Sequence, residues 1–110
     1  MIEKTIDEIE AKIRGANSVN GERKNELLQL LAALKTEIGS LEKTHGEHAR
    51  SIAGFANVSA HEATREKQNP QLLQHSLAGL RASVNGFEQS HPKLVQLVNS
   101  ISNTLSNFGI

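Results

Sequence analysis

Apolar residues recur at alternating steps of three and four along most of this chain of 110 residues. A seven-residue repeat of this kind places the apolar side chains on one face of an α-helix and is typical of coiled-coil-like packing. The pattern predicts an all-α protein whose long amphipathic helices bury an aliphatic face. The longest run is Leu73, Leu77, Leu80, Val84, Phe87, His91, Leu94, Val98, Ile101, Leu105 and Phe108.

The breaks in the repeat predict where each helix begins and ends. Ser59 and Glu62 have the spacing of a capping box, and Asn69 before Pro70 is typical of a helix start. His91-Pro92 interrupts the last helix without changing its phase, which indicates a kink rather than an end. A break near His45-Gly46 is the alternative to one continuous second helix. The helices are expected over about residues 2–14, 21–57, 60–67 and 70–108, with the kink near 91–92.

The two long helices have matching lengths of about 38 residues, or roughly 57 Å each. Folded back on one another, they predict an elongated antiparallel hairpin with the short N-terminal helix beside one end. A lone hairpin would expose part of its apolar seam, so we expect homodimerisation to complete a helical bundle. The residues expected in this core seam or interface are Leu31, Leu34, Ile38, Leu41, Leu77, Leu80, Val84, Phe87, Leu94, Val98, Ile101 and Leu105.

Composition argues against several classes of function. The 12 basic residues equal the 12 acidic ones, which removes the general attraction to nucleic acids and anionic membranes. The chain has no cysteine, and its first residues lack the pattern of a secretory signal. No apolar run approaches the roughly 20 residues that span a bilayer. We therefore expect a single cytoplasmic domain that binds neither nucleic acid nor membrane.

Two Glu-x-x-His pairs are the strongest chemical motif. Glu42 with His45, and Glu88 with His91, would each point a carboxylate and an imidazole the same way from a helix. Such pairs build di-metal sites in ferritin-like bundles. In the expected hairpin, however, the pairs would lie about 13 Å apart along the helices. We expect no cofactor and no catalytic residue, and keep Glu42, His45, His48, Glu88 and His91 as alternative metal ligands.

His45 and His48 occupy successive seam positions, where three interpretations stay open. Polar seam residues often fix the register or oligomeric state of a bundle. Imidazoles titrate near neutral pH, so the pair could respond to pH. A simple metal site with two histidines is the third interpretation.

The C-terminal segment from Phe87 to Leu94, with the sequence F-E-Q-S-H-P-K-L, continues to a terminal Gly109-Ile110. This ending resembles a small bacterial family of domains of unknown function, numbered forty-four oh four, whose members end in F-E-x-x-H-P-x-L followed by G-I. The likeness covers about the last 25 residues. It implies a bacterial source and a helical fold, and it implies no chemistry.

Taken together, these features predict a non-enzymatic helical scaffold or adaptor that self-associates, most simply as a dimer, and that could also bind another protein. The alternatives are a metal-binding bundle that uses the Glu-x-x-His pairs, or a pH-responsive interaction module.

Overall fold

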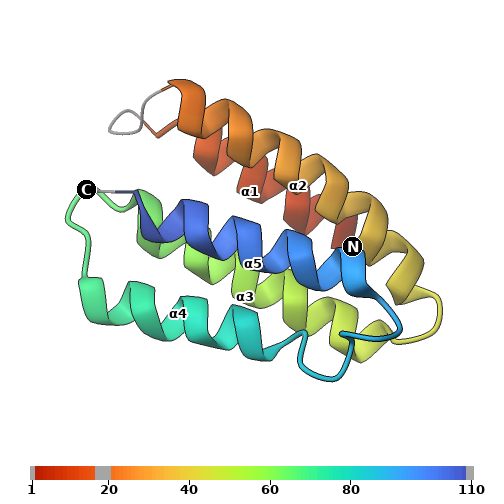
Figure 1. Ribbon diagram of the computed structural model, residues 1–110. Coiled ribbons are helices and arrows are strands. Elements are labelled where there is room, and N and C mark those ends of the chain that lie inside the picture. Colours follow the sequence, from red (N-terminus) through yellow and green to blue (C-terminus); the bar gives the residue numbers. More distant parts are fainter. Residues whose placement is uncertain (1, 17–20, 109–110) are drawn as a thin grey trace.

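Five helices and no strand make up the part of the chain that the structure describes, residues 2–16 and 21–108 of a computed structural model. The all-α prediction is confirmed. Successive helices run in alternating directions along one axis (Figure 1). The helices are α1 (Ile2–Arg14), α2 (Gly21–Glu42), α3 (Gly46–Thr64), α4 (Pro70–Ala82) and α5 (Pro92–Ser106).

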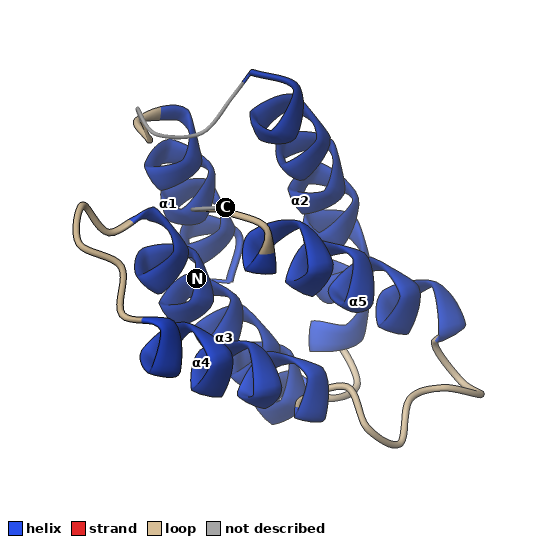
Figure 2. Ribbon diagram, turned by 60° about the vertical axis from the view of Figure 1, so that its left-hand side comes forward, coloured by secondary structure: helices blue, strands red, loops and turns tan. Residues whose placement is uncertain are grey.

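The predicted elongated shape is wrong. The molecule measures 37 × 23 × 21 Å, so its longest dimension is shorter than either long helix expected from the repeat. Each expected long helix is instead divided, and its two parts fold into an antiparallel hairpin. The result is one hairpin of α2 and α3, a second of α4 and α5, and α1 packed against the first (Figures 1 and 2).

The helix predicted over 21–57 ends at Glu42, so the prediction of one continuous helix is wrong and the alternative break is correct. At this turn the Leu41 carbonyl accepts hydrogen bonds from the backbone N–H groups of Thr44 (3.1 Å) and His45 (2.8 Å). The chain then enters α3, which continues to Thr64. A separate helix over 60–67 is therefore also wrong, because the expected capping box lies inside α3.

The kink expected at His91-Pro92 is also wrong, because residues 83–91 form a loop between two helices. The loop turns at Gly86, whose φ of 94° is a conformation that favours glycine. The Glu88 carboxylate oxygens accept a hydrogen bond from the Gly86 N–H, at 2.8 and 3.1 Å. Pro92 is the first residue of α5, where a missing N–H removes no helical hydrogen bond.

The start of α4 is as the sequence predicts. Asn69 precedes the helix, and its side-chain oxygen accepts hydrogen bonds from the N–H groups of Gln71 (3.0 Å) and Leu72 (3.2 Å). Pro70 occupies the first helical position. This cap satisfies two of the backbone donors that every helix start leaves unpaired.

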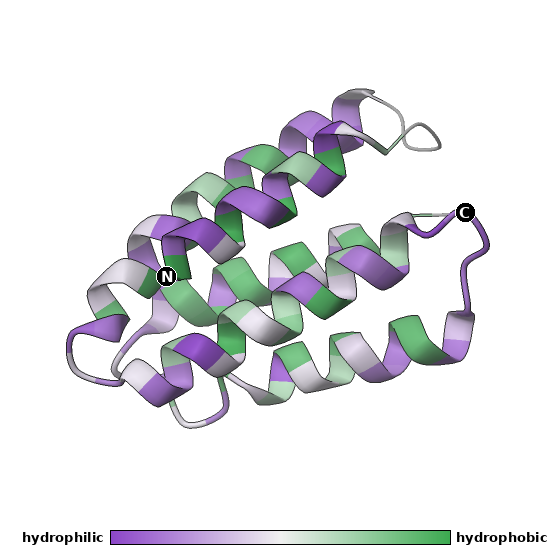
Figure 3. Cartoon of the chain, turned by 180° about the vertical axis from the view of Figure 1, so that it is seen from behind, coloured by the Kyte–Doolittle hydropathy of each residue, from purple (hydrophilic) through white to green (hydrophobic). Residues whose placement is uncertain are grey.

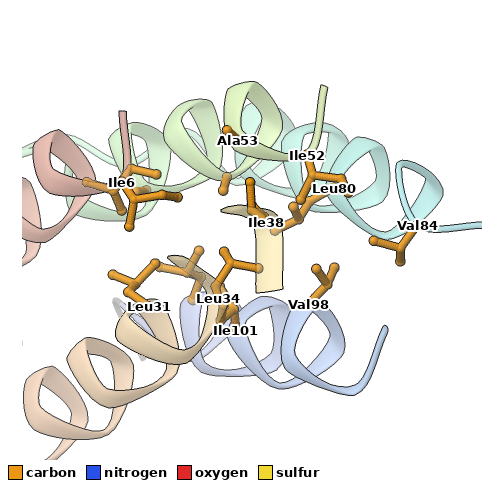
Figure 4. Packing of buried hydrophobic residues seen from close by; sticks show 14 of the residues in the cluster. Ile6, Leu31, Leu34, Ile38, Ile52, Ala53, Leu80, Val84, Val98 and Ile101 are labelled. Carbon is orange, nitrogen blue, oxygen red and sulfur yellow. The ribbon is translucent and has the colours of Figure 1, made fainter. Parts of the chain in front are cut away.

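The core lies between the two hairpins and α1. The twelve apolar residues expected in the core seam or interface, from Leu31 to Leu105, are all buried in it within one chain. Figure 4 shows side chains from α1, α2, α3 and α5 converging there, among them Ile6, Ile38 and Val98. Apolar segments accordingly alternate with polar ones along each helix (Figure 3). Because other helices of the same chain cover the seam, its exposure no longer argues for a dimer.

The two hairpins repeat one pattern at an offset of 46 residues. Leu27, Leu31 and Leu34 correspond to Leu73, Leu77 and Leu80, and all six are buried. The repeat continues through Glu42 and His45, which correspond to Glu88 and His91. The helix α1 has no counterpart in this repeat. The fold is therefore a repeated helical hairpin with one additional helix.

Candidate functional site

Three histidines and one phenylalanine gather where the turn after α2 meets the loop after α4. This turn and this loop lie at the same end of the bundle (Figure 1). The ring centroid of His45 lies 6.2 Å from that of His91 and 6.2 Å from that of His48. Phe87 is buried beneath them, with centroid distances of 5.5, 5.3 and 5.5 Å to His45, His48 and His91. We call these four residues the histidine cluster.

The two hairpins deliver His45 and His91 to the cluster in the same way. Each residue directly precedes a helix, with φ and ψ of −136° and 59° at His45 and −138° and 61° at His91. Each backbone N–H donates to the carbonyl four residues earlier, at 2.8 Å in both turns. The two histidines are therefore equivalent residues of the repeated hairpin, held in one backbone conformation.

A neighbouring hydroxyl orients each of these imidazoles. His45 Nδ1 lies 2.8 Å from Thr44 Oγ1, and His91 Nδ1 lies 2.9 Å from Ser90 Oγ. Thr44 Oγ1 also donates a long hydrogen bond of 3.4 Å to the Leu41 carbonyl. In the tautomer with the proton on Nδ1, the hydroxyl accepts from Nδ1–H of His45 and Nε2 carries the free lone pair.

The expected separation of the two Glu-x-x-His pairs is wrong. The 13 Å estimate assumed continuous helices, and the breaks at residues 43–45 and 83–91 bring His45 and His91 together instead. The Glu88 carboxylate is not directed to the histidines, since it accepts a hydrogen bond from the backbone N–H of Gly86. Within residues 2–16 and 21–108, no group of three or more His, Asp or Glu residues is arranged to hold a metal ion.

The cluster borders water. His45 and His48 are exposed and His91 is half-buried, while Phe87 is only 7% exposed. The imidazoles thus lie against a buried aromatic ring at the end of the core. The expected placement of His45 and His48 in the buried seam is wrong, because both side chains are exposed. The pH-responsive and metal-binding interpretations stay predictions, and the structure adds His91 and Phe87 to the residues they involve.

A second candidate surface lies along α3 and α4. Phe55, Val58 and Leu72 are 41%, 49% and 44% exposed, and they are the exposed large apolar residues of the described chain. In the sequence, Phe55 continues the seam of residues 27–52, but in the structure its side chain is partly exposed. The Phe55 ring lies against Gly79 of α4, and a Cβ atom at position 79 would overlap this ring. We call Phe55, Val58 and Leu72 the apolar stripe.

Reading the sequence for long helices missed the arrangement of both surfaces. One signal could have found the histidine cluster: L-E-K-T-H at residues 41–45 and F-E-Q-S-H at residues 87–91 are the same motif, 46 residues apart. A repeat of a whole hairpin puts equivalent turns at equivalent places. No signal of comparable strength marks the apolar stripe, because its exposure depends on which helices pack against α3.

None of the helices in the described segments is both long and apolar enough to cross a lipid bilayer.

Comparison with known proteins gives one match. The search of curated proteins and the search of solved structures each return no similar protein. A family model described as a domain of unknown function (DUF4404) matches residues 27–110. The match starts at Leu27, within α2, so it includes the rest of the first hairpin and all of α4 and α5, and it leaves out α1. It covers well over half of the chain. The chain therefore belongs to the DUF4404 family of domains of unknown function.

Proposed function

We propose that this protein is a non-enzymatic helical adaptor that self-associates weakly, as a dimer, through the apolar stripe. The observation that carries the proposal is that the exposed large apolar side chains of the described chain lie on one pair of helices. Contiguous exposed apolar surface in a folded protein commonly marks an interaction site. The seam is covered within one chain, so the stripe is the apolar surface left for a partner.

The three stripe residues share one side of the α3–α4 pair. Val58 follows Phe55 by about one helical turn, and Phe55 packs over Gly79 on the neighbouring helix. Leu72 precedes Gly79 by seven residues, which is two turns and hence the same face of α4. Beside the stripe, Ser51 and Gly54 join Phe55 and Val58 in lining an open hollow of about 270 Å³.

A second copy of the chain is the occupant that this surface fits. A two-fold dimer needs a self-complementary patch, and the stripe offers protruding side chains next to a hollow at Gly54. The net charge of zero means that two copies do not repel each other at long range. Three half-exposed side chains supply far less than the roughly 800 Å² per partner of a standard interface. We therefore expect a reversible dimer that forms at high micromolar concentration.

Sedimentation equilibrium between about 10 µM and 1 mM protein tests this proposal directly. The weight-average mass should rise towards twice 12.0 kDa across the range. The double variant Val58→Glu, Leu72→Glu should remain monomeric, because a symmetric dimer would bring these carboxylates close together and remove them from water.

The matched control is Gln29→Glu, Gln96→Glu, which adds the same charge at exposed positions of α2 and α5, away from the stripe. This control should dimerise like the wild type. A wild-type mass of 12 kDa at 1 mM, or a control that dissociates as completely as the stripe variant, would contradict the proposal.

We also propose a bacterial source and a cytoplasmic location. The C-terminal motif supports a bacterial source, although its Gly109-Ile110 ending lies outside the described residues. The absence of cysteine supports the cytoplasm as the compartment. The equal numbers of acidic and basic residues support a protein partner over nucleic acid or a membrane surface.

A pH-responsive role for His45 and His48 is a separate prediction. The thermal stabilities of wild type and His45→Leu should then diverge between pH 5 and 8, and parallel stability curves would argue against this role.

A further inference from the structure

We infer that His45 and His91 form a binding site for one divalent transition-metal ion, of the kind that prefers imidazole nitrogen. The inference rests on the matched conformation of two histidines from the two hairpins. It is independent of the apolar stripe and of dimerisation. The carboxylates of the Glu-x-x-His motifs take no part in it.

The orientation of the rings is the first argument. The hydroxyls of Thr44 and Ser90 hold the Nδ1 atoms at 2.8 and 2.9 Å, so Nε2 is the nitrogen that each ring has left for a ligand. Histidines that bind metals usually hydrogen-bond through the other ring nitrogen, which fixes the tautomer and makes the ligating nitrogen more basic. Neither imidazole bonds to the start of the helix that follows it.

The spacing of the rings is the second argument. With a metal–nitrogen distance of about 2.0–2.1 Å, two imidazole centroids that share an ion lie roughly 5 Å apart at a tetrahedral angle and roughly 6.4 Å apart when the two ligands are opposite each other. The 6.2 Å between His45 and His91 lies within these limits but is about 1 Å wider than the tetrahedral value, and rotation of the exposed His45 side chain would close that difference. Phe87, at 5.5 Å from both rings, limits their movement on the side of the core.

The composition of the site determines the kind of ion. Two neutral imidazoles suit Zn²⁺, Cu²⁺ or Ni²⁺ and offer nothing to Mg²⁺ or Ca²⁺, which prefer oxygen ligands. No third protein ligand completes the site within the described chain, and His45 is exposed, so water fills the remaining positions. Such a site binds at micromolar rather than nanomolar concentration and exchanges its ion freely. His48, 6.2 Å from His45, lies close enough to assist the approach of the ion.

The experiment is a zinc titration of protein purified without an affinity tag, at pH 7.5, in competition with a chromophoric chelator. One Zn²⁺ per chain should bind. His45→Gln and His91→Gln should each weaken binding by at least about ten-fold, and the double variant should abolish it. His75→Gln is the matched control, since His75 is exposed on α4 outside the cluster, and it should bind like the wild type.

NMR of the imidazole nitrogens in the wild-type protein keeps the test valid if a variant unfolds. Addition of Zn²⁺ should shift Nε2 of His45 and His91 far more than Nε2 of His75. Three outcomes would overturn the inference: no binding below 1 mM, binding that survives in the double variant, or shifts at His45 and His48 without one at His91.

Discussion

The two hairpins of this protein start from the same sequence pattern and reach different structures. In the first, α2 continues without a break to Glu42 and a three-residue turn leads into α3. In the second, α4 ends at Ala82, and the residues equivalent to the last turns of α2 form an irregular loop. Both hairpins then reach the same turn, in which Glu, any residue, a hydroxyl residue and His follow one another (residues 42–45 and 88–91). The turn geometry is therefore set locally, independently of whether a helix precedes it.

The residues at the point of divergence explain the difference. The first hairpin has Gly39-Ser40 where the second has Asn85-Gly86. One glycine costs a helix about 1 kcal/mol relative to alanine, an amount that the buried neighbours Ile38 and Leu41 can offset. Asn-Gly is in addition a strong turn sequence, and Gly86 takes the positive φ that such a turn requires.

The hairpins also differ in what covers them. The isoleucine stripe of α1 packs on α3 and α2, so the first hairpin is enclosed on more sides than the second. Five of the buried residues of α3 are alanines, which allow close approach of its neighbours, whereas none of the buried residues of α5 is an alanine. The family match begins within α2 and does not include α1.

The largest expected effect comes from truncating equivalent core residues. Leu34→Ala and Leu80→Ala remove side chains that are both 0% exposed, one in each hairpin. Each change should lower the free energy of unfolding by about 2–5 kcal/mol, because it leaves a cavity. Urea denaturation measures both values. Should one hairpin unfold separately, its variant would show two transitions, and the view of one shared core would have to be abandoned.

Replacing a glycine by alanine should change the free energy of unfolding in opposite directions in the two hairpins. Gly86→Ala forces a side chain into a φ of 94° and should destabilise the protein by about 1–3 kcal/mol. Gly39→Ala adds a methyl group to a helix interior where nothing lies within 4 Å, and should stabilise by up to about 1 kcal/mol. Thermal unfolding of both variants measures the difference. Equal signs would mean that the Asn-Gly turn does not explain the divergence.

A smaller effect is expected where the second hairpin contacts the first. Gly79 corresponds to Ala33, and a methyl group at Gly79 would overlap the ring of Phe55. Gly79→Ala should therefore change stability little, because displacing Phe55 offsets the gain in helix propensity of about 1 kcal/mol. In a Phe55→Ala background the same change should stabilise by about that amount. The two denaturation midpoints measure the coupling, and identical effects in both backgrounds would exclude the contact.

The smallest effect concerns the ion pair by which α1 meets α2. Lys35 Nζ donates to Asp7 Oδ1 at 2.8 Å, and this hydrogen bond raises the pKa of Lys35 above its ordinary value of 10.5. A raised lysine pKa stabilises the fold below pH 10.5 and loses that contribution as the pH rises through the folded-state pKa. The stability gap between wild type and Asp7→Asn should close on titration from pH 9 to 12, as followed by circular dichroism. Because the pair is exposed, we expect this difference in stability to be small. A difference between wild type and Asp7→Asn that widened as the pH rose would contradict the assignment of the raised Lys35 pKa to Asp7.

Much of the fold could be read from the sequence. The isoleucine spacing marked the face that α1 buries, and Asn69-Pro70 marked the start of α4 because caps are local chemistry. The seam residues of both hairpins are buried, since a seven-residue repeat directs side chains to one side wherever the helix lies. The sequence pattern pointed to His45, His48 and His91 as candidate site residues, but it did not predict that the rings of His45 and His91 lie 6.2 Å apart.

What the tertiary structure decided is where each heptad run breaks. A repeat of three and four keeps its phase across a turn, so it cannot distinguish one long helix from two that fold back on each other. Folding back lets the chain cover its own seam, and burial of that surface outweighs the few helical hydrogen bonds lost at residues 43–45 and 83–91. The same choice brought His45 beside His91 and left Phe55, Val58 and Leu72 facing water.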